Sequence, residues 1–217
     1  MSERSRDHIL SRIRNAVGEG SADRASRAEL EGRLASPQSG PLPALDDDGV
    51  SRFIAKAEGN GLTVEPIVSL DLLVPAVGRV MSDAGVSTDI SIAPALADLP
   101  WPEPWLANIG AGRFEEHISV TLAAAGIAET GSVIFRSGPD SPATLNFLPD
   151  IHVVVLRTAD IVTYPEEAWQ RFRDESNGWP RAMNVIAGPS RTADVGGIIV
   201  RPAHGPKAVH LLLVGND

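Results

Sequence analysis

A short polar loop bounded by two glycines carries the first residues that could do chemistry. Residues 126–131 read G-I-A-E-T-G. Gly126 and Gly131 bound this loop, and the carboxylate of Glu129 and the hydroxyl of Thr130 lie between them. Glycine tolerates positive φ angles and lets a backbone approach a ligand closely, and turns at strand ends of α/β sheets commonly bind ligands. The same pattern is also consistent with a plain sharp turn in which Glu129 caps exposed backbone N–H groups.

A second Gly-led polar loop covers residues 188–194. Two hydroxyls and a guanidinium occur there on three successive residues, Ser190, Arg191 and Thr192. Together with the backbone N–H groups of such a loop, these side chains suit an anion such as a phosphate or a carboxylate. Alternatively, Arg191 pairs with Asp194 and braces the loop. The residue types leave both interpretations open.

Other polar residues extend these two loops. If the loops meet at one edge of a sheet, Glu129 faces the anion-binding loop and could act as a general base or accept a hydrogen bond from a sugar hydroxyl. His204, in the turn H-G-P, is a candidate acid, base or hydrogen-bonding group, or a structural residue of the turn. Asp150 and His152 are spaced i, i+2 and would leave a strand by the same face. No third ligand follows at a recognisable spacing, so we predict no metal site.

The composition excludes several classes of protein. The chain has 217 residues, of which 43% are apolar, and a formal net charge of −9 with a pI of about 5.0. This acidity argues against nonspecific binding of nucleic acid or anionic membranes. The chain contains no cysteine, which excludes disulfides, a thiol nucleophile and cysteine-ligated iron–sulfur clusters within it. Neither a Walker-type P-loop nor a G-x-S-x-G motif occurs.

The first 43 residues differ from the rest of the chain. Apolar residues at helical spacing predict an amphipathic helix over residues 4–17, and a Pro/Gly/Ser cluster at residues 36–43 is typical of a linker. We therefore predict a helical arm over residues 1–43 and a compact domain over residues 44–217. The arm either packs on its own domain or docks on another subunit to form a homo-oligomer. Because the sequence shows neither an apolar signal segment nor a long apolar run, we expect a cytoplasmic protein without a membrane span.

Alternating helix and strand patterns predict an α/β fold for the compact domain. Helical spacing around Phe53 and over residues 70–81 alternates with β-rich runs at residues 62–68 and 86–93. This order favours parallel strands joined by crossover helices. A connection rich in proline and tryptophan follows at residues 94–112 and is expected to be a covering loop or lid. Its tryptophans either fill an apolar seam or stack on a ligand. The remaining elements are two strands around the first polar loop, a short helix and a strand before residue 156, a helix beginning at Pro165, and strands at residues 182–187, 198–201 and 208–214.

Five strings carry a resemblance to a known family. They are G-I-A-E-T-G-S-V (126–133), S-G-P (137–139), L-P-D-I-H-V-V-V (148–155), G-P-S-R-T-A-D-V (188–195) and H-G-P (204–206). In this order and spacing they resemble the lactate utilization protein C (LutC) family of the LUD domain, over roughly residues 115–214. The resemblance marks residues 44–217 as a LUD-type domain.

The resemblance implies a fold of the type shared by sugar-phosphate isomerases and CoA transferases, with a mostly parallel sheet flanked by helices. It implies a role in the oxidation of L-lactate to pyruvate, as an accessory subunit that acts with iron–sulfur partner proteins. Any cysteine-ligated clusters would then belong to the partners. We expect a small anionic ligand, with Glu129 as the candidate catalytic residue. The candidate ligand-binding residues are Gly126, Thr130, Gly131, Ser190, Arg191, Thr192 and His204.

Two other functions remain open. One is a stand-alone enzyme that acts on a phosphosugar or a CoA ester, with Glu129 as base or nucleophile. The other is a small-molecule sensor without catalysis, because a ligand that binds only the folded state stabilises it whether or not it reacts.

Overall fold

The computed structural model describes residues 3–17, 24–37, 40–45, 48–105, 107–113, 116–175, 178–192, 200 and 202–215. The chain divides into two compact units, Met1–Pro43 and Ala44–Asp217. Among the described residues, no helix is both long enough and apolar enough to cross a bilayer. The cytoplasmic location stays a prediction.

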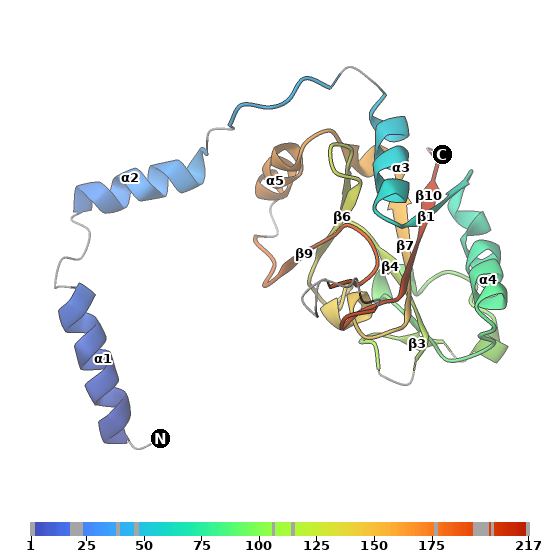
Figure 1. The fold of residues 1–217 in the computed structure, drawn as a ribbon, viewed down its shortest axis with the longest axis horizontal. Helices are drawn as coiled ribbons and strands as arrows, with labels where there is room; N and C mark the ends of the chain where they lie inside the picture. Colours follow the sequence, from blue (N-terminus) through green and yellow to red (C-terminus); the bar gives the residue numbers. More distant parts are fainter. Residues whose placement is uncertain are drawn as a thin grey trace. The chain divides into compact units, whose positions relative to one another are not determined.

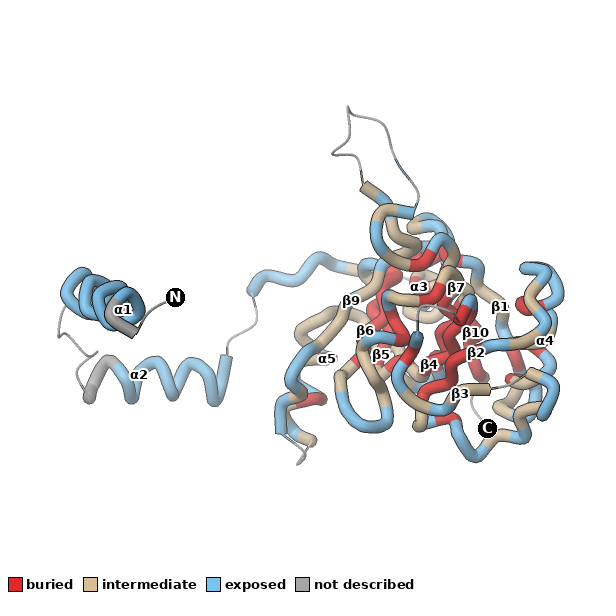
Figure 2. The backbone as a smooth tube through the Cα atoms, turned by 90° about the horizontal axis from the view of Figure 1, so that it is seen from below, coloured by how far each residue is buried: buried red, intermediate tan, exposed pale blue. Residues whose placement is uncertain are grey.

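The first unit consists of two helices, α1 (Glu3–Val17) and α2 (Arg24–Ala35). The first was expected from its apolar spacing, whereas the second was not, because its stretch reads as polar sequence with little apolar periodicity. Where the structure describes their side chains, nearly all residues of both helices are exposed (Figure 2). The exposed large hydrophobic side chains are Ile9, Ile13, Leu30 and Leu34.

The second unit is built on a six-stranded sheet in which every neighbouring pair is parallel. Its strand order is β1-β10-β7-β4-β2-β3. The parallel α/β architecture expected from the sequence is therefore confirmed, and the finer fold name stays a prediction. The strands are β1 (Thr63–Ile67), β2 (Ile90–Ile92), β3 (Asn108–Ile109), β4 (Ile118–Leu122), β7 (Ile151–Arg157) and β10 (Ala208–Val214).

A second, four-stranded sheet was not expected as a separate layer. Its order is β8-β5-β6-β9, with β5–β6 and β6–β9 antiparallel and β5–β8 parallel. The chain changes sheets between two adjacent alanines: the N–H of Ala123 donates to Val155 of the first sheet, and the N–H of Ala124 donates to Ile134 of the second. The strands are β5 (Ala125–Ile127), β6 (Ser132–Arg136), β8 (Ile161–Val162) and β9 (Met183–Ile186).

Three helices cover these sheets: α3 (Gly49–Gly59), α4 (Leu73–Asp83) and α5 (Pro165–Asp174) (Figure 1). The buried side chains of α4 join one face of the parallel sheet, whereas Phe53 and Ala57 of α3 join the opposite face and β6. Helix α5 packs on the second sheet through Ala168 and Phe172. Asp48 caps α3 by accepting a hydrogen bond from the N–H of Ser51, as expected for an acidic residue before a helix.

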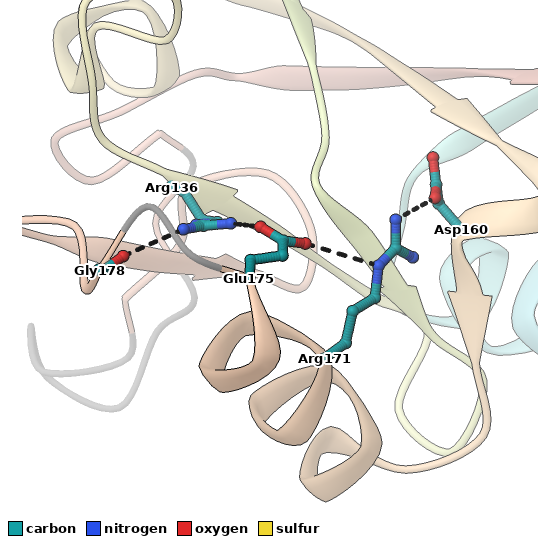
Figure 3. A network of polar contacts seen from close by, with 5 residues as sticks. All are labelled: Arg136, Asp160, Arg171, Glu175 and Gly178. Atoms are coloured by element: carbon teal, nitrogen blue, oxygen red, sulfur yellow. Dashed lines mark hydrogen bonds and ion pairs between the residues drawn. The ribbon is translucent and has the colours of Figure 1, made fainter.

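A chain of charged groups holds α5 and the segment after it against β6 (Figure 3). Arg136 of β6 pairs with Glu175, donates to the carbonyl of Gly178 and lies over the ring of Phe172. Arg171 of α5 in turn contacts Glu175 and donates to Asp160. Because these contacts join β6 to α5 and to the chain on either side of it, they fix the second sheet's outer layer.

Short 3-10 helices fill the connections. The first of them, η1 (Leu70–Leu72), leads into α4 after Ser69, which makes no side-chain capping hydrogen bond there. In the connection at residues 94–112, Trp101 and Trp105 pack against the core of the parallel sheet, as expected for residues that cover an apolar seam. The others are η2 (Pro94–Leu96), η3 (Glu103–Trp105), η4 (Ala143–Asn146) and η5 (Thr158–Asp160).

Candidate functional site

A cavity of about 340 Å³ is lined by residues of both sheets. Strands β7 and β10 contribute from the first sheet and β9 from the second, and η4 and two polar segments complete the wall. Its volume lies at the lower end of the range of ligand pockets, roughly 300–1,000 Å³. The lining residues are Asn146, Phe147, His152, Val185, Ile186, Ala187, Gly188, Ser190, His204, Gly205, Pro206 and Val209.

His152 is the second residue of β7 and is fully buried. Its Nε2 atom hydrogen-bonds to the hydroxyl of Thr121 at 2.7 Å, and its ring lies 5.3 Å from that of Phe135. Burial disfavours the charged imidazolium and lowers the pKa of His152 to about 3. The ring is therefore neutral at neutral pH. Its Nδ1 atom, which is also buried, has no hydrogen-bonding partner in the described part of the chain.

Asn146 ends η4 and is 1% exposed. Neither the nitrogen nor the oxygen of its side-chain amide has a hydrogen-bonding partner among the residues described. The helical turn that carries it is held in place on both sides, because Ser119 donates to the carbonyl of Leu145 and the hydroxyl of Thr144 accepts from the N–H of Gly112. Buried polar groups without partners are rare in folded proteins, so each such group calls for an explanation.

Ser190 joins the second polar loop to the turn that contains His204. The Ser190 hydroxyl oxygen accepts from the N–H groups of Ala203, His204 and Gly205 at 3.3, 3.2 and 3.1 Å. Its own N–H donates to the carbonyl of Pro206. Two residues chosen from the sequence, Ser190 and His204, therefore lie together on the cavity wall. His204 is exposed, unlike His152.

The other two residues chosen from this loop, Arg191 and Thr192, do not line the cavity. Thr192 instead forms a backbone bridge with Val200. The alternative pairing of Arg191 with Asp194 falls outside the described residues. An anion-binding role for Arg191 and Thr192 thus stays a prediction.

The first polar loop packs against α3 and does not line the cavity. A Cβ atom at Gly126 would lie 2.7 Å from the Cδ2 atom of Leu156. Gly131 has a φ of +68°, and a Cβ there would overlap the backbone nitrogen of Ala57. Close packing therefore already accounts for both glycines, and their role in ligand binding stays a prediction.

Glu129 and Thr130 lie in the turn between β5 and β6. The N–H of Glu129 donates to the carbonyl of Thr163 at 3.0 Å, and the hydroxyl of Thr130 contacts that of Ser132 at 2.6 Å. The amide of Asn60, at the C-terminal end of α3, donates to the carbonyl of Thr130.

Asn60 also adjoins the second loop. A Cβ atom at Gly188 would overlap the carbonyl oxygen of Asn60. The structure thus brings the two polar loops to the same end of α3, but only the second loop reaches the cavity.

The pair Asp150 and His152, spaced like the start of a metal site, diverges in the structure. Asp150 precedes β7 and contacts Lys207 at 3.0 Å and His117 at 3.5 Å. The hydrogen bond from Lys207 lowers the pKa of Asp150 below its usual value. These three side chains line a separate hollow of about 590 Å³, but they are 43–61% exposed and pair with one another. Nowhere in the described residues do three His, Cys, Asp or Glu side chains gather to hold a metal ion.

Sequence reasoning therefore found part of this wall but missed Asn146 and the place of His152 in the cavity. His152 was singled out only as half of a metal site, and Asn146 was not singled out at all. The string L-N-F-L-P-D-I-H contains both residues, but nothing in their spacing predicts a shared cavity.

The LUD domain family matches residues 113–214, a range that contains every lining residue of the cavity. An uncharacterized protein of Neisseria meningitidis is 31% identical over 117 residues, covering 54% of this chain and 47% of that protein. Lactate utilization protein C of Anoxybacillus flavithermus is 30% identical over 114 residues, covering 50% and 51% of the two chains. The protein of the same name from Bacillus subtilis is 29% identical over 103 residues, covering 46% and 43%. The chain thus spans about half the length of the curated relatives it matches.

A crystal structure of a DUF162 family protein from Deinococcus radiodurans has the same overall fold. Its TM-score is 0.56 at 22% identity, and the match covers 80% of this chain and 100% of that chain. At this identity the match supports the fold alone. The family match and the named relatives confirm the resemblance found in the sequence. Residues 113–214 thus match the LUD domain family, and the chain is similar to proteins named lactate utilization protein C.

Proposed function

We propose that this chain takes part in lactate utilization as a ligand-binding subunit, and that its cavity takes a small 2-hydroxy or 2-oxo acid such as lactate or pyruvate. The names of the relatives support the metabolic role. The cavity between the two sheets supports the binding role, because it lies inside the LUD-matching range and combines apolar walls with a few convergent polar groups.

A single observation carries the binding site. Two buried side chains of the cavity wall, Asn146 and His152, present three polar atoms that no described residue satisfies. Leaving a buried polar group unpaired costs about 1–3 kcal/mol. A bound oxygen-containing molecule can supply the missing partners, so the unpaired atoms favour a polar ligand at this wall.

Within lactate utilization we propose an accessory role beside iron–sulfur partner proteins in the cytoplasm. Oxidation of lactate to pyruvate removes two electrons and two protons, so an electron acceptor is needed. This chain has no cysteine with which to ligate a cluster. The electrons would pass to clusters held by the partners, while this chain binds the organic acid.

Calorimetric titration of the purified chain with L-lactate and pyruvate tests the binding role. We expect saturable binding of at least one acid by the full-length protein, and a loss of affinity of about tenfold or more in Asn146→Leu, equivalent to at least about 1.4 kcal/mol. The matched control is Asn108→Leu, on β3 and outside the cavity. If neither acid binds the unmodified chain, the ligand class is wrong.

The accessory role has a separate test. Purification of the chain from its native host at natural expression should recover cysteine-rich iron–sulfur proteins with it. Repeated recovery of the chain alone, together with turnover of a phosphosugar or a CoA ester by the isolated chain, would favour a stand-alone enzyme instead.

A further inference from the structure

We propose that Asn146 and His152 recognise the uncharged oxygen at C2 of the ligand, its hydroxyl or its carbonyl, and that the ligand's carboxylate stays at the exposed side of the cavity near His204. This inference rests on the proposed function. It specifies which group of the acid each part of the cavity wall contacts.

The hydrogen-bonding capacity of the wall matches such an oxygen. The Asn146 amide offers a donor and an acceptor, and the Nδ1 atom of His152 offers one or the other according to its tautomer. A hydroxyl both donates and accepts, whereas a carbonyl only accepts. A 2-hydroxy acid can therefore donate to one unpaired acceptor and accept from the amide of Asn146, and a 2-oxo acid can accept from the same amide.

Thr121 lets His152 hydrogen-bond to either a hydroxyl or a carbonyl of the ligand. Its hydroxyl lies 2.7 Å from the Nε2 atom of His152 and can either accept from Nε2–H or donate to a bare Nε2. In the first case Nδ1 is an acceptor for a ligand hydroxyl. In the second case Nδ1–H is a donor for a ligand carbonyl. The pair Thr121–His152 can thus hydrogen-bond to either the 2-hydroxy or the 2-oxo acid while the ring of His152 stays neutral.

The described cavity wall around Asn146 and His152 carries no charged side chain, which disfavours binding of the ligand's carboxylate there. Among the described lining residues there is no Lys, Arg, Asp or Glu. Burial also keeps the His152 ring neutral, because it lowers the pKa of that ring far below neutral pH. A carboxylate placed against two fully buried, uncharged side chains would lose its water without gaining a counter-charge, which is costly. The exposed His204 side leaves the carboxylate in contact with solvent.

The apolar lining residues determine which side chain of the acid fits the cavity. Val209 is the strand partner of His152, Phe147 follows Asn146 in the chain, and Ile186 is a further apolar lining residue. These surfaces suit a methyl group or a longer hydrocarbon chain rather than a second charge. The expected class is therefore monocarboxylic 2-hydroxy and 2-oxo acids with an apolar side chain.

Four probes separate the hydroxyl from the charge: L-lactate, propionate, L-lactamide and propionamide, each titrated calorimetrically into the full-length protein. We expect each hydroxyl-bearing probe to bind at least about tenfold more tightly than its partner without the hydroxyl, because a site built to hydrogen-bond an OH rejects analogues that lack it. Equal affinity of lactate and propionate would overturn the inference while leaving the proposed function intact.

The two amides keep the inference testable if the acids fail. If neither acid binds but lactamide binds more tightly than propionamide, the anionic ligand class falls and the hydroxyl recognition stands. If none of the four probes binds and pyruvate does not bind either, both proposals are overturned.

Variants of the protein test whether Asn146 causes the preference for the hydroxyl. Asn146→Leu should abolish the preference for the hydroxyl without lowering the melting temperature, because leucine of similar size removes an unsatisfied buried amide. Asn108→Leu should keep the preference. A preserved preference in Asn146→Leu contradicts the inference. If Asn146→Leu does not fold, Asn146→Ser is used instead, because it shortens the side chain and removes the amide. The same ratio of affinities then decides the outcome.

Discussion

The contrast between His152 and His204 shows how position decides what one residue type can do. His204 was chosen from the sequence as an acid, base or hydrogen-bonding group, and it lies exposed on the cavity wall. His152 is fully buried, with a pKa lowered by the loss of water around its ring. The buried histidine thus offers a neutral hydrogen-bonding surface inside the cavity wall, whereas the exposed one stays in contact with solvent.

The depressed pKa of His152 predicts a pH dependence of stability. The unfolded chain binds a proton at this histidine below about pH 6.5, whereas the folded chain does so only near pH 3. The stabilisation is therefore fully present above about pH 6.5 and is lost as the pH falls, with a slope of up to about 1.4 kcal/mol per pH unit. Urea unfolding at a series of pH values from 7 to 5, roughly the window where carboxylates stay ionised, measures this slope.

The same slope of unfolding free energy against pH is measured for the variants His152→Gln and His210→Gln. His210 is also buried in part, and desolvation lowers its pKa as well, so each variant should remove its own share of the slope. A wild-type slope that persists unchanged in His152→Gln would show that this histidine is not the cause.

Glu129 remains the predicted catalytic residue, although it lies in a turn that does not line the cavity. If it acts as a general base, Glu129→Gln should lower turnover by about 100-fold or more. The assay follows pyruvate formation by the chain together with its partner proteins. Glu103→Gln, an exposed residue of η3, is the control. Undiminished turnover in Glu129→Gln would exclude the role.

At the scale of elements, the glycines of the first polar loop show how a motif can serve packing. Gly126 lies against Leu156 and Phe53, and Gly131 lies against the backbone of α3. Because α3 would be displaced by a side chain at either position, the loop fixes the distance between α3 and the second sheet. The turn between β5 and β6 is thereby held near Asn60.

Gly131→Ala should strongly destabilise the fold. The substitution places a side chain at a φ of +68°, which alone costs about 1–2 kcal/mol, and it also clashes with the backbone at Ala57. The expected loss in the free energy of unfolding is therefore more than about 2 kcal/mol, measured by chemical denaturation. Gly138→Ala, in a loop where a Cβ meets nothing within 4 Å, should change stability by less than about 0.5 kcal/mol. Similar effects for the two variants would contradict this account.

At the scale of the whole molecule, the chain has one unit with a hydrophobic core and one of exposed helices. Among the residues whose burial the structure describes, the buried ones belong to Ala44–Asp217, where they form three hydrophobic clusters. The unit Met1–Pro43 has exposed apolar side chains on both helices. The prediction that this arm joins copies of the chain stays open.

Deletion of residues 1–43 should leave the second unit folded. Its melting temperature should change by no more than a few degrees, because the core clusters contain no residue of the arm. If the arm docks on a second copy, light scattering should show a smaller assembly after the deletion. Loss of cooperative unfolding would contradict the independent core, and an unchanged molar mass would exclude the docking role.

The cavity also has an unexpected place in the fold. In parallel α/β sheets, ligands usually bind beyond the carboxyl ends of the strands. Here His152 and Val209 are the second residues of β7 and β10, so the cavity lies toward the amino ends of these two strands. The second sheet makes this possible, because β9 closes a space that would be open in a single-sheet fold.

Local pattern was enough to determine most of the elements. The apolar spacing predicted α1, α3, α4 and α5, because periodicity and helix ends depend on near neighbours in the chain. The β-rich runs predicted the parallel strands other than β3, which lies in the stretch expected to be a connection. The family strings likewise predicted the LUD domain, and the choice of Ser190 and His204 placed two residues on the cavity wall.

Only the tertiary structure decided which of the candidate residues share a site. Asn146 and His152 belong to different elements, and their polar atoms became informative only because packing buried them without partners. In the same way, the division into two sheets follows from hydrogen bonds between strands distant in sequence. Burial and pairing depend on long-range contacts, and a pattern of residue types carries no direct record of them.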